Sequence, residues 1–253
     1  MRKTVYFLGT KEIGSECLQI LINHYHQKEI DIVGVLTNDR SLGGENKSVK
    51  ELAIENNLKV IEDLAQFENE PDADFIISVQ YHQILRQRHI DKATTLAVNL
   101  HMAPLPEYRG CNQFSFAIID VAKTFGTTLH QLVRSADAGP ILFEERFVMP
   151  DEIFVKELYQ LTYEKSIALF KNHIGDIFKG SYQLTPQEQL EQERGCSLHF
   201  RKEIEALKVI DANWDADKKK RYFRATYFPP FEPPKLKTEN GLVPLSLAQY
   251  QLF

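Results

Sequence analysis

The sequence predicts an α/β fold with a mostly parallel central sheet and a short C-terminal subdomain. Short apolar runs alternate with helical patterns through the N-terminal part of the chain, as they do in successive βα units. Two of these runs, Ile32–Leu36 and Phe75–Val79, lack a strict alternation of apolar and polar residues. Such strands are covered on both faces, so we expect both at the centre of a parallel sheet.

The elements of the N-terminal part follow directly from the apolar runs. Strands and helices are expected to alternate at Val5–Leu8, Ile13–Ile22, Ile30–Leu36, Val49–Ile54, Phe75–Val79 and Leu96–Leu100. A further helix is expected after Gly110–Asn112, with these residues as its cap.

The C-terminal part continues with a pair of strands, Phe125–Val133 and Ile141–Val148, and a long helix from Leu158 to Phe178. The stretch 185–195 is polar and weakly patterned, and we interpret it as a linker. A hairpin is expected around Asn240-Gly241. The 253 residues suffice for a main domain over 1–184 and a small subdomain over 185–253.

Composition argues against several classes of protein. A formal net charge of -5 and a pI near 5.9 disfavour bulk attraction to nucleic acid. The three cysteines are widely separated, so we expect no disulfide framework and no zinc site, and Cys111 is interpreted as a packed thiol. We expect no metal, no membrane span and no signal peptide, hence a cytoplasmic protein.

Three polar residues next to turns indicate chemistry at a carbonyl group. Asn99 and His101 have the same parity in an apolar run, so they point the same way at the end of a strand. Asp137 precedes the turn Ala138-Gly139-Pro140, from which its carboxylate can reach the same edge. An amide can stabilise a developing oxyanion, an imidazole can move a proton, and a carboxylate can orient the imidazole.

The segment Gly9–Gly14 allows two interpretations. It follows a strand and opens a helix, but it lacks the Gly-x-Gly-x-x-Gly spacing of dinucleotide sites. It is either a plain turn or a place where backbone N–H groups and Lys11 meet a substrate phosphate. The aromatic and proline cluster Tyr227–Pro234 and Trp214 are likewise either core residues or a platform for a nucleobase.

Four segments together resemble a known signature. Asn99-Leu100-His101, Leu105–Gly110, Gly126–His130 and Asp137-Ala138-Gly139 follow in the order Asn-x-His, Leu-Pro-x-Tyr-Arg-Gly, Gly-x-Thr and Asp-x-Gly. This pattern resembles that of the folate-dependent formyltransferases, from the first expected strand to the end of the long helix. The resemblance implies a Rossmann-like formyltransferase domain and N10-formyltetrahydrofolate as formyl donor.

By this resemblance, Asn99, His101 and Asp137 are the catalytic residues. Asn99 and His101 would stabilise the oxyanion, and Asp137 would organise His101 and a route for the proton. The family's folate loop corresponds to Val79–Leu85, although His82 stands where glycine is usual. The residues expected to hold the pterin ring are Tyr81, Gln83, Ile84, Leu85, Ala136, Asp137, Ala138 and Gly139. Met102-Ala103-Pro104 replaces the usual Pro-Ser-Leu, so a hydroxyl is missing near the site.

The tail favours one acceptor class. Tyr222–Pro234 resembles the short tail of nucleotide-sugar N-formyltransferases, in which Arg-Ala-x-x-Phe-Pro-Pro-Phe recurs. The implied acceptor is the amino group of a nucleotide-linked amino sugar, such as a 4-amino-4,6-dideoxyhexose of O-antigen (lipopolysaccharide) synthesis, and the implied assembly is a homodimer. The residues expected to bind it are Gly9, Thr10, Lys11, Tyr108, Arg109, Asn112, Trp214, Tyr227, Phe228 and Phe231.

Other functions stay open at this point. The first is formylation of methionyl-tRNA, whose enzymes carry a longer, basic C-terminal domain. The second is a non-catalytic module that keeps affinity for folate or nucleotide. Hydrolysis of the formyl donor and transfer to a purine precursor are disfavoured by the aromatic tail, because neither needs a platform for a base.

Overall fold

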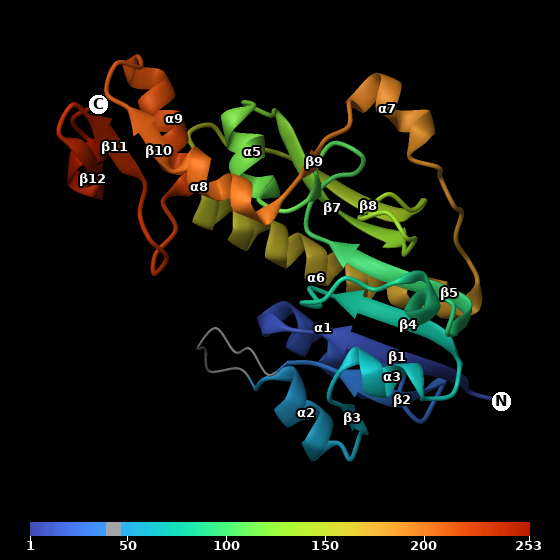
Figure 1. The fold of residues 1–253 in the computed structure, drawn as a ribbon. Coiled ribbons are helices and arrows are strands. Elements are labelled where there is room, and N and C mark those ends of the chain that lie inside the picture. The colour runs from blue at the N-terminus through green and yellow to red at the C-terminus, as the bar shows by residue number, and fades with distance from the viewer. Residues whose placement is uncertain (39–46) are drawn as a thin grey trace.

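The computed structural model describes residues 1–38 and 47–253. Its main body is a seven-stranded sheet in the order β3-β2-β1-β4-β5-β7-β8 (Figure 1). The strands from β3 to β5 run parallel, and β7 and β8 continue the sheet antiparallel. The expected α/β fold with a mostly parallel central sheet is therefore confirmed.

The strands of the main sheet coincide with the apolar runs. Their bounds are Lys3–Gly9 (β1), Ile30–Leu36 (β2), Val60–Ile61 (β3), Ala73–Val79 (β4), Ala93–His101 (β5), Thr124–Gln131 (β7) and Ile141–Val148 (β8). The expected strand pair is the β7–β8 hairpin. β3 was not anticipated, because two residues are too few to show a period.

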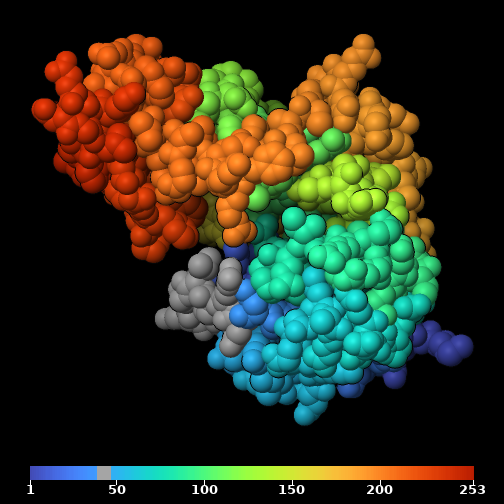
Figure 2. All heavy atoms as spheres, in the orientation of Figure 1, coloured from blue at the N-terminus to red at the C-terminus, as the bar shows by residue number. Residues whose placement is uncertain are grey.

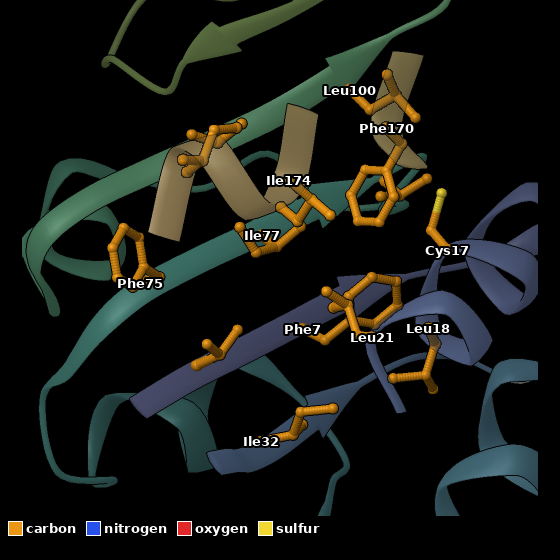
Figure 3. Packing of buried hydrophobic residues seen from close by; sticks show 14 of the residues in the cluster. Phe7, Cys17, Leu18, Leu21, Ile32, Phe75, Ile77, Leu100, Phe170 and Ile174 are labelled. Carbon is orange, nitrogen blue, oxygen red and sulfur yellow. The ribbon is translucent and has the colours of Figure 1, made fainter. Parts of the chain in front are cut away.

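Helices cover both faces of the parallel sheet. The helices on one face are α1 (Lys11–His24), α2 (Val49–Glu55) and α6 (Val155–Lys179), and those on the other are α3 (Leu64–Glu68) and α4 (Gln87–Ile90). Phe170 and Ile174 of α6 lie over Ile77 of β4, and Leu21 of α1 lies over Phe7 of β1 (Figure 3). All five are almost completely buried, which fixes the sheet against its helices.

α5 (Gln113–Ile119) begins where the sequence predicts a helix, but its expected cap is wrong. Asn112 has φ 60° and makes no side-chain bond to the helix. Its Nδ2 donates instead to the carbonyl oxygens of Phe200 at 2.9 Å and Arg201 at 3.2 Å. Asn112 therefore ties the start of α5 to a distant part of the chain.

The segment interpreted as a linker is a packed element. After α6 the chain continues to α7 (Glu188–Arg194). It then runs across the front of the molecule, in the view of Figures 1 and 2, towards the C-terminal part. Thr185 exchanges two backbone hydrogen bonds of 2.9 Å with Ile141, and Gln187 is fully buried. The segment expected to be a linker therefore bonds to the main domain through Thr185 and Gln187, whereas Glu188, Gln189, Gln192 and Glu193 are exposed.

The crossing segment pairs with the main domain before it enters the C-terminal subdomain. β9 (Leu198–His199) runs parallel to β6 (Arg109–Gly110). The helices η1 (Arg201–Glu203) and α8 (Ile204–Leu207) follow.

The C-terminal subdomain is a small sheet with two helices. Its elements are β10 (Val209–Asp211), α9 (Ala216–Thr226), β11 (Lys235–Thr238), β12 (Gly241–Pro244) and α10 (Leu247–Tyr250). β11 and β12 form the hairpin expected around Asn240-Gly241. α9 packs against α5 and α6 of the main domain (Figure 1). Within the described ranges, no helix has the length and apolar character needed to cross a bilayer.

Candidate active site

Two strand ends and one loop bring four polar side chains together. Asn99 and His101 lie near the end of β5, and Asn99 is directly opposite His130 of the antiparallel neighbour β7. Asp137 reaches them from the loop between β7 and β8. The predicted trio of Asn99, His101 and Asp137 is thus brought to one place, and His130 joins it.

The carboxylate of Asp137 lies between the two imidazoles. Its Oδ1 is 3.5 Å from Nε2 of His130, and its Oδ2 is 3.7 Å from Nδ1 of His101. The backbone N–H of Gly110 donates to Oδ2 at 2.9 Å. Nε2 of His130 also lies 3.1 Å from Nδ2 of Asn99, so polar contacts of 3.1 to 3.7 Å link all four side chains.

Backbone carbonyls determine which ring nitrogens can exchange protons in the site. Nε2 of His101 donates to the carbonyl of Tyr108 at 2.8 Å, and Nδ1 of His130 donates to the carbonyl of Gln131 at 3.0 Å. A carbonyl oxygen can only accept, so these two nitrogens are assigned their protons. The other nitrogen of each ring faces Asp137.

Asp137 is held ionised by its surroundings. Burial alone would raise the pKa of its carboxyl, but the charge of His101 and the hydrogen bonds from His130 and Gly110 outweigh this and hold the pKa well below its usual range. The residue has φ 49°, a left-handed conformation that costs a non-glycine residue about 1 kcal/mol. The site therefore keeps a charged, strained residue at its centre.

His130 is the site residue that the sequence analysis missed. The motif Gly126–His130 was recognised, but the histidine itself was not selected. Its signal is the register position opposite Asn99, which a histidine of β7 occupies. His130 is only 1% exposed, whereas Asn99 is half-buried. His130 therefore orients Asn99 and Asp137 from the interior of the protein.

A cavity of about 290 Å³ lies on the same two strands, β5 and β7, although none of these four side chains lines it. It lies between α4, β5 and the end of β7, where Ala97 is two residues from Asn99 and Gln131 is next to His130. Its lining consists of Gln87, Ile90, Asp91, Ala93, Thr95, Leu96, Ala97, Gln131, Leu132 and Val133. The volume is near the lower end of the ~300–1,000 Å³ typical of ligand pockets, which suits one ring system of a larger ligand.

The chain matches the family model described as formyl transferase over residues 3–172. It belongs to the formyl transferase family. The methionyl-tRNA formyltransferase of Mycoplasma capricolum is 29% identical over 201 residues, which are 74% of this chain and 61% of that protein. The GDP-perosamine N-formyltransferase of Brucella melitensis is 29% identical over 184 residues, which are 71% of this chain and 66% of that protein. The chain thus spans about three fifths to two thirds of the length of these relatives.

Solved structures share the fold over nearly the whole chain. WlaRD, a sugar 3N-formyl transferase crystallised with dTDP and 5-N-formyl-THF, has a TM-score of 0.76 at 24% identity and covers 92% of this chain and 82% of its own. The N-formyltransferase of Helicobacter canadensis, in complex with folinic acid and dTDP-3-aminofucose, has a TM-score of 0.76 at 21% identity, with coverages of 94% and 85%. A 4-N formyltransferase of Francisella tularensis has a TM-score of 0.76 at 17% identity and covers 97% of each chain.

In this formyl transferase, the residues predicted to hold folate flank the cavity instead of lining it. The first predicted group ends at Leu85, just before α4, and the second begins at Ala136, just after the lining residue Val133. Ile84 is a large apolar side chain that is 84% exposed. His82, which stands where glycine is usual, does not have a positive φ, whereas Gln80 has φ 52°. The histidine is therefore not strained by its backbone conformation.

The predicted phosphate site gathers at the ends of β1 and β4. The hydroxyl of Thr10 donates to the carbonyl oxygen of Gln80, and Nζ of Lys11 donates to Oε1 of Gln80 at 3.0 Å. Gly9 is the last residue of β1. Burial lowers the pKa of Lys11, and the neighbouring charge of Arg201 lowers it further. Two cations from distant segments therefore face each other here.

Tyr108 and Arg109, both predicted to bind substrate, make contacts within the protein. The hydroxyl of the buried Tyr108 donates to Asp120 at 3.4 Å, and burial together with Asp120 raises its pKa. Nε of Arg109 donates to Oε1 of Gln187 at 2.9 Å, and Nη2 donates to Glu191 at 2.9 Å. Arg109 thus contacts the α7 region.

The predicted aromatic residues divide between two cores. Trp214 and Tyr227 pack in the cluster of the C-terminal subdomain, and Phe228 packs against Tyr159 of α6. Phe231 is 56% exposed and makes an edge contact with Phe228. The ring contacts of these residues lie away from Asp137, and a stacking role for them stays a prediction.

The missing hydroxyl near the catalytic strand is compensated by β7. Met102 and Ala103 are fully buried. Thr127 and Thr128 donate their hydroxyls to the carbonyl oxygens of His101 at 2.9 Å and Ala103 at 2.8 Å. These bonds hold the backbone at and after His101.

Proposed function

We propose that this chain transfers a formyl group from N10-formyltetrahydrofolate to the amino group of a nucleotide-linked amino sugar. The observation that carries the proposal is the network of Asn99, His101, His130 and Asp137 beside a cavity of about 290 Å³. The network offers a hydrogen-bond donor and a proton acceptor, and the cavity can hold a donor molecule next to them.

The lining of the cavity fits the pteridine end of a folate. Its apolar side chains, among them Ile90 and Leu132, suit the faces of a flat ring, and Gln87 and Asp91 supply polar atoms for the edge. In the proposal, the entrance of the cavity is flanked by two segments, Tyr81 to Leu85 and Ala136 to Gly139. Two of the similar solved structures were crystallised with 5-N-formyl-THF or folinic acid, which supports this choice of donor.

The side chains then have separate tasks. The neutral amine of the acceptor attacks the formyl carbon, a C–N bond forms, and the carbonyl electron pair moves onto oxygen. The amide of Asn99 can donate an N–H to this oxyanion, while His101 supplies positive charge. Asp137 organises the route by which the ammonium proton passes to N10 of the folate as the C–N10 bond breaks, which gives a formamide and tetrahydrofolate.

The choice of a nucleotide-linked acceptor depends on the ligands of similar structures and on charge. Two of the similar solved structures were crystallised with dTDP or with dTDP-3-aminofucose. A net charge of -5 is unfavourable for binding tRNA. Both observations support a small acceptor over a nucleic acid.

Lys11 and Arg201 form the proposed site for the diphosphate of the acceptor. Arg201 is exposed and forms no ion pair with another described residue, and its charge disfavours the protonated form of Lys11. A diphosphate between the two side chains would relieve this repulsion and accept hydrogen bonds from both. The site lies at the N-terminus of α1, where the helix dipole also favours an anion.

The acceptor is tested with a panel. Wild-type protein is incubated with N10-formyltetrahydrofolate and, in separate reactions, dTDP-, GDP- and UDP-linked amino sugars or charged initiator tRNA, and products are identified by mass. We expect a mass gain of one formyl group on an amino-sugar nucleotide only. Formylation of the tRNA alone would support the second candidate, which the 29% identity to a methionyl-tRNA formyltransferase favours. Tetrahydrofolate formation without any formylated acceptor would contradict both.

A further inference from the structure

We propose that Gln187 is a positioning residue that holds the backbone of the Asp137 loop and thereby aims the carboxylate at the two histidines. Gln187 lies just before α7, in the stretch that its composition marks as a linker. It is fully buried, although its neighbours Glu188 and Gln189 are exposed. The inference rests on the proposed role of Asp137, but not on the identity of the acceptor.

Both N–H groups of the Gln187 carboxamide donate to carbonyl oxygens of the Asp137 loop, one on each side of Ala138. Nε2 donates to the carbonyl oxygen of Asp137 at 2.8 Å and to that of Gly139 at 2.7 Å. Oε1 accepts from Nε of Arg109 at 2.9 Å. A buried amide without partners would destabilise the fold, so its burial here reflects three bonds that only a carboxamide can make together.

These bonds close a ring of contacts around Asp137. The backbone of Asp137 is held by Gln187, and its carboxylate accepts from the N–H of Gly110 at 2.9 Å. Gly110 is the chain neighbour of Arg109, which returns to Gln187. Asp137 is therefore held at its backbone by Gln187 and at its carboxylate by Gly110, and Arg109 connects these two segments.

The loop needs such support because its conformation is unfavourable by itself. Asp137 has φ 49°, and the turn between Ser135 and Ala138 is closed by a single long hydrogen bond of 3.3 Å. At Gly139 the chain passes so close to β7 that an added Cβ would lie 1.8 Å from the carbonyl oxygen of Gln131. The loop is thus pinned at Gly139, and the position of the carboxylate depends on the bond between Gln187 and Asp137.

α7 holds Gln187 from the other side. Nη2 of Arg109 donates to Glu191 at 2.9 Å, and Arg194 forms an ion pair of 2.9 Å with Glu144 of β8. The helix is therefore fastened to the loop before β6 and to the strand after the Asp137 loop. Figure 1 shows α7 beside the β7–β8 hairpin.

The test uses two substitutions of similar volume and one control. Gln187→Met removes all three bonds, and Gln187→Glu keeps the contact with Arg109 but places a carboxylate against two carbonyl oxygens. We expect kcat to fall about 10- to 100-fold in both, because a shift of ~1 Å in a catalytic group has effects of this size. KM for the acceptor should change less than twofold. Gln189→Glu, an exposed change of the same chemistry in the same helix, should keep the wild-type kcat.

Two further measurements separate positioning from a general effect on folding. In an Asp137→Asn background, Gln187→Met should cost less than twofold, because the group that it positions is already absent. Hydrogen exchange should increase in residues 133–140 of Gln187→Glu, while the exchange of β1 and β4 stays as in the wild type.

Three results would overturn the inference. The first is a wild-type kcat in both Gln187 variants while Asp137→Asn is slow. The second is an equal loss from Gln187→Met in the wild-type and Asp137→Asn backgrounds, which indicates a merely structural role. The third is unchanged exchange over 133–140 in Gln187→Glu. A wild-type rate in Asp137→Asn alone would instead contradict the proposed function.

Discussion

Replacing Asp137 by asparagine keeps the shape of the side chain and removes its charge. In the protein, the carboxylate lies 3.5 and 3.7 Å from the two imidazoles, and burial excludes most of the water that would screen these contacts. At such distances, an ion pair with an imidazolium is worth about 4 kcal/mol at an effective dielectric constant of ~20. If the transition state carries this charge and the ground state does not, kcat falls about 10³-fold.

The assay for Asp137→Asn is the initial rate of tetrahydrofolate formation at saturating concentrations of both substrates. KM values and the melting temperature are measured in parallel, since the hydrogen bond from Gly110 can persist to an amide oxygen. A kcat within about fivefold of the wild type, in a folded variant, would refute the role given to the carboxylate.

Three further predictions concern the donor cavity, the diphosphate site and acid stability. Thr95→Trp places a large side chain at the exposed part of the cavity lining, so KM for the folate should rise at least about 10-fold. The control is Thr94→Trp, which is also exposed but lies on the opposite face of β5. This control should leave KM for the folate unchanged. Arg201→Ala should raise KM for the acceptor about 10- to 100-fold through the loss of a charge-assisted hydrogen bond. The control Lys202→Ala should leave this KM unchanged. Equal KM values for the two variants would exclude the diphosphate site. Because the folded pKa of Asp137 is lowered, its carboxylate stabilises the fold above its unfolded pKa of about 3.9, and this contribution is lost as the pH falls below that value. Urea unfolding should therefore show a larger deficit for Asp137→Asn at pH 7 than at pH 3, and a constant deficit would count against the lowered pKa.

Much of the fold could be predicted from the sequence because its strands carry their own signals. Continuous apolar runs such as Phe75–Val79 mark buried parallel strands wherever they occur, and β4 has these bounds apart from two residues at its start. The trio of the candidate site was also predictable. Parity places Asn99 and His101 on one face, and the turn after Asp137 brings the carboxylate to them.

The parts that were missed depend on contacts between distant segments. His130 becomes a site residue only through the antiparallel register that sets it opposite Asn99. Gln187 carries no local signal, because a glutamine after a proline in a polar stretch is typical of an exposed loop. Its burial depends on the backbone of Asp137 and on Arg109, which are far away in the sequence.

The central claim is that the formyl group moves intact from the folate to a sugar nitrogen. The most direct test is a reaction of the wild-type protein with donor labelled by ¹³C in the formyl group and the best amino-sugar nucleotide of the panel, labelled by ¹⁵N at its amino group, followed by NMR. The account predicts one labelled formamide signal coupled to the sugar nitrogen, with tetrahydrofolate formed in equal amount. Label that appears in free formate, or that stays on the folate, would contradict it.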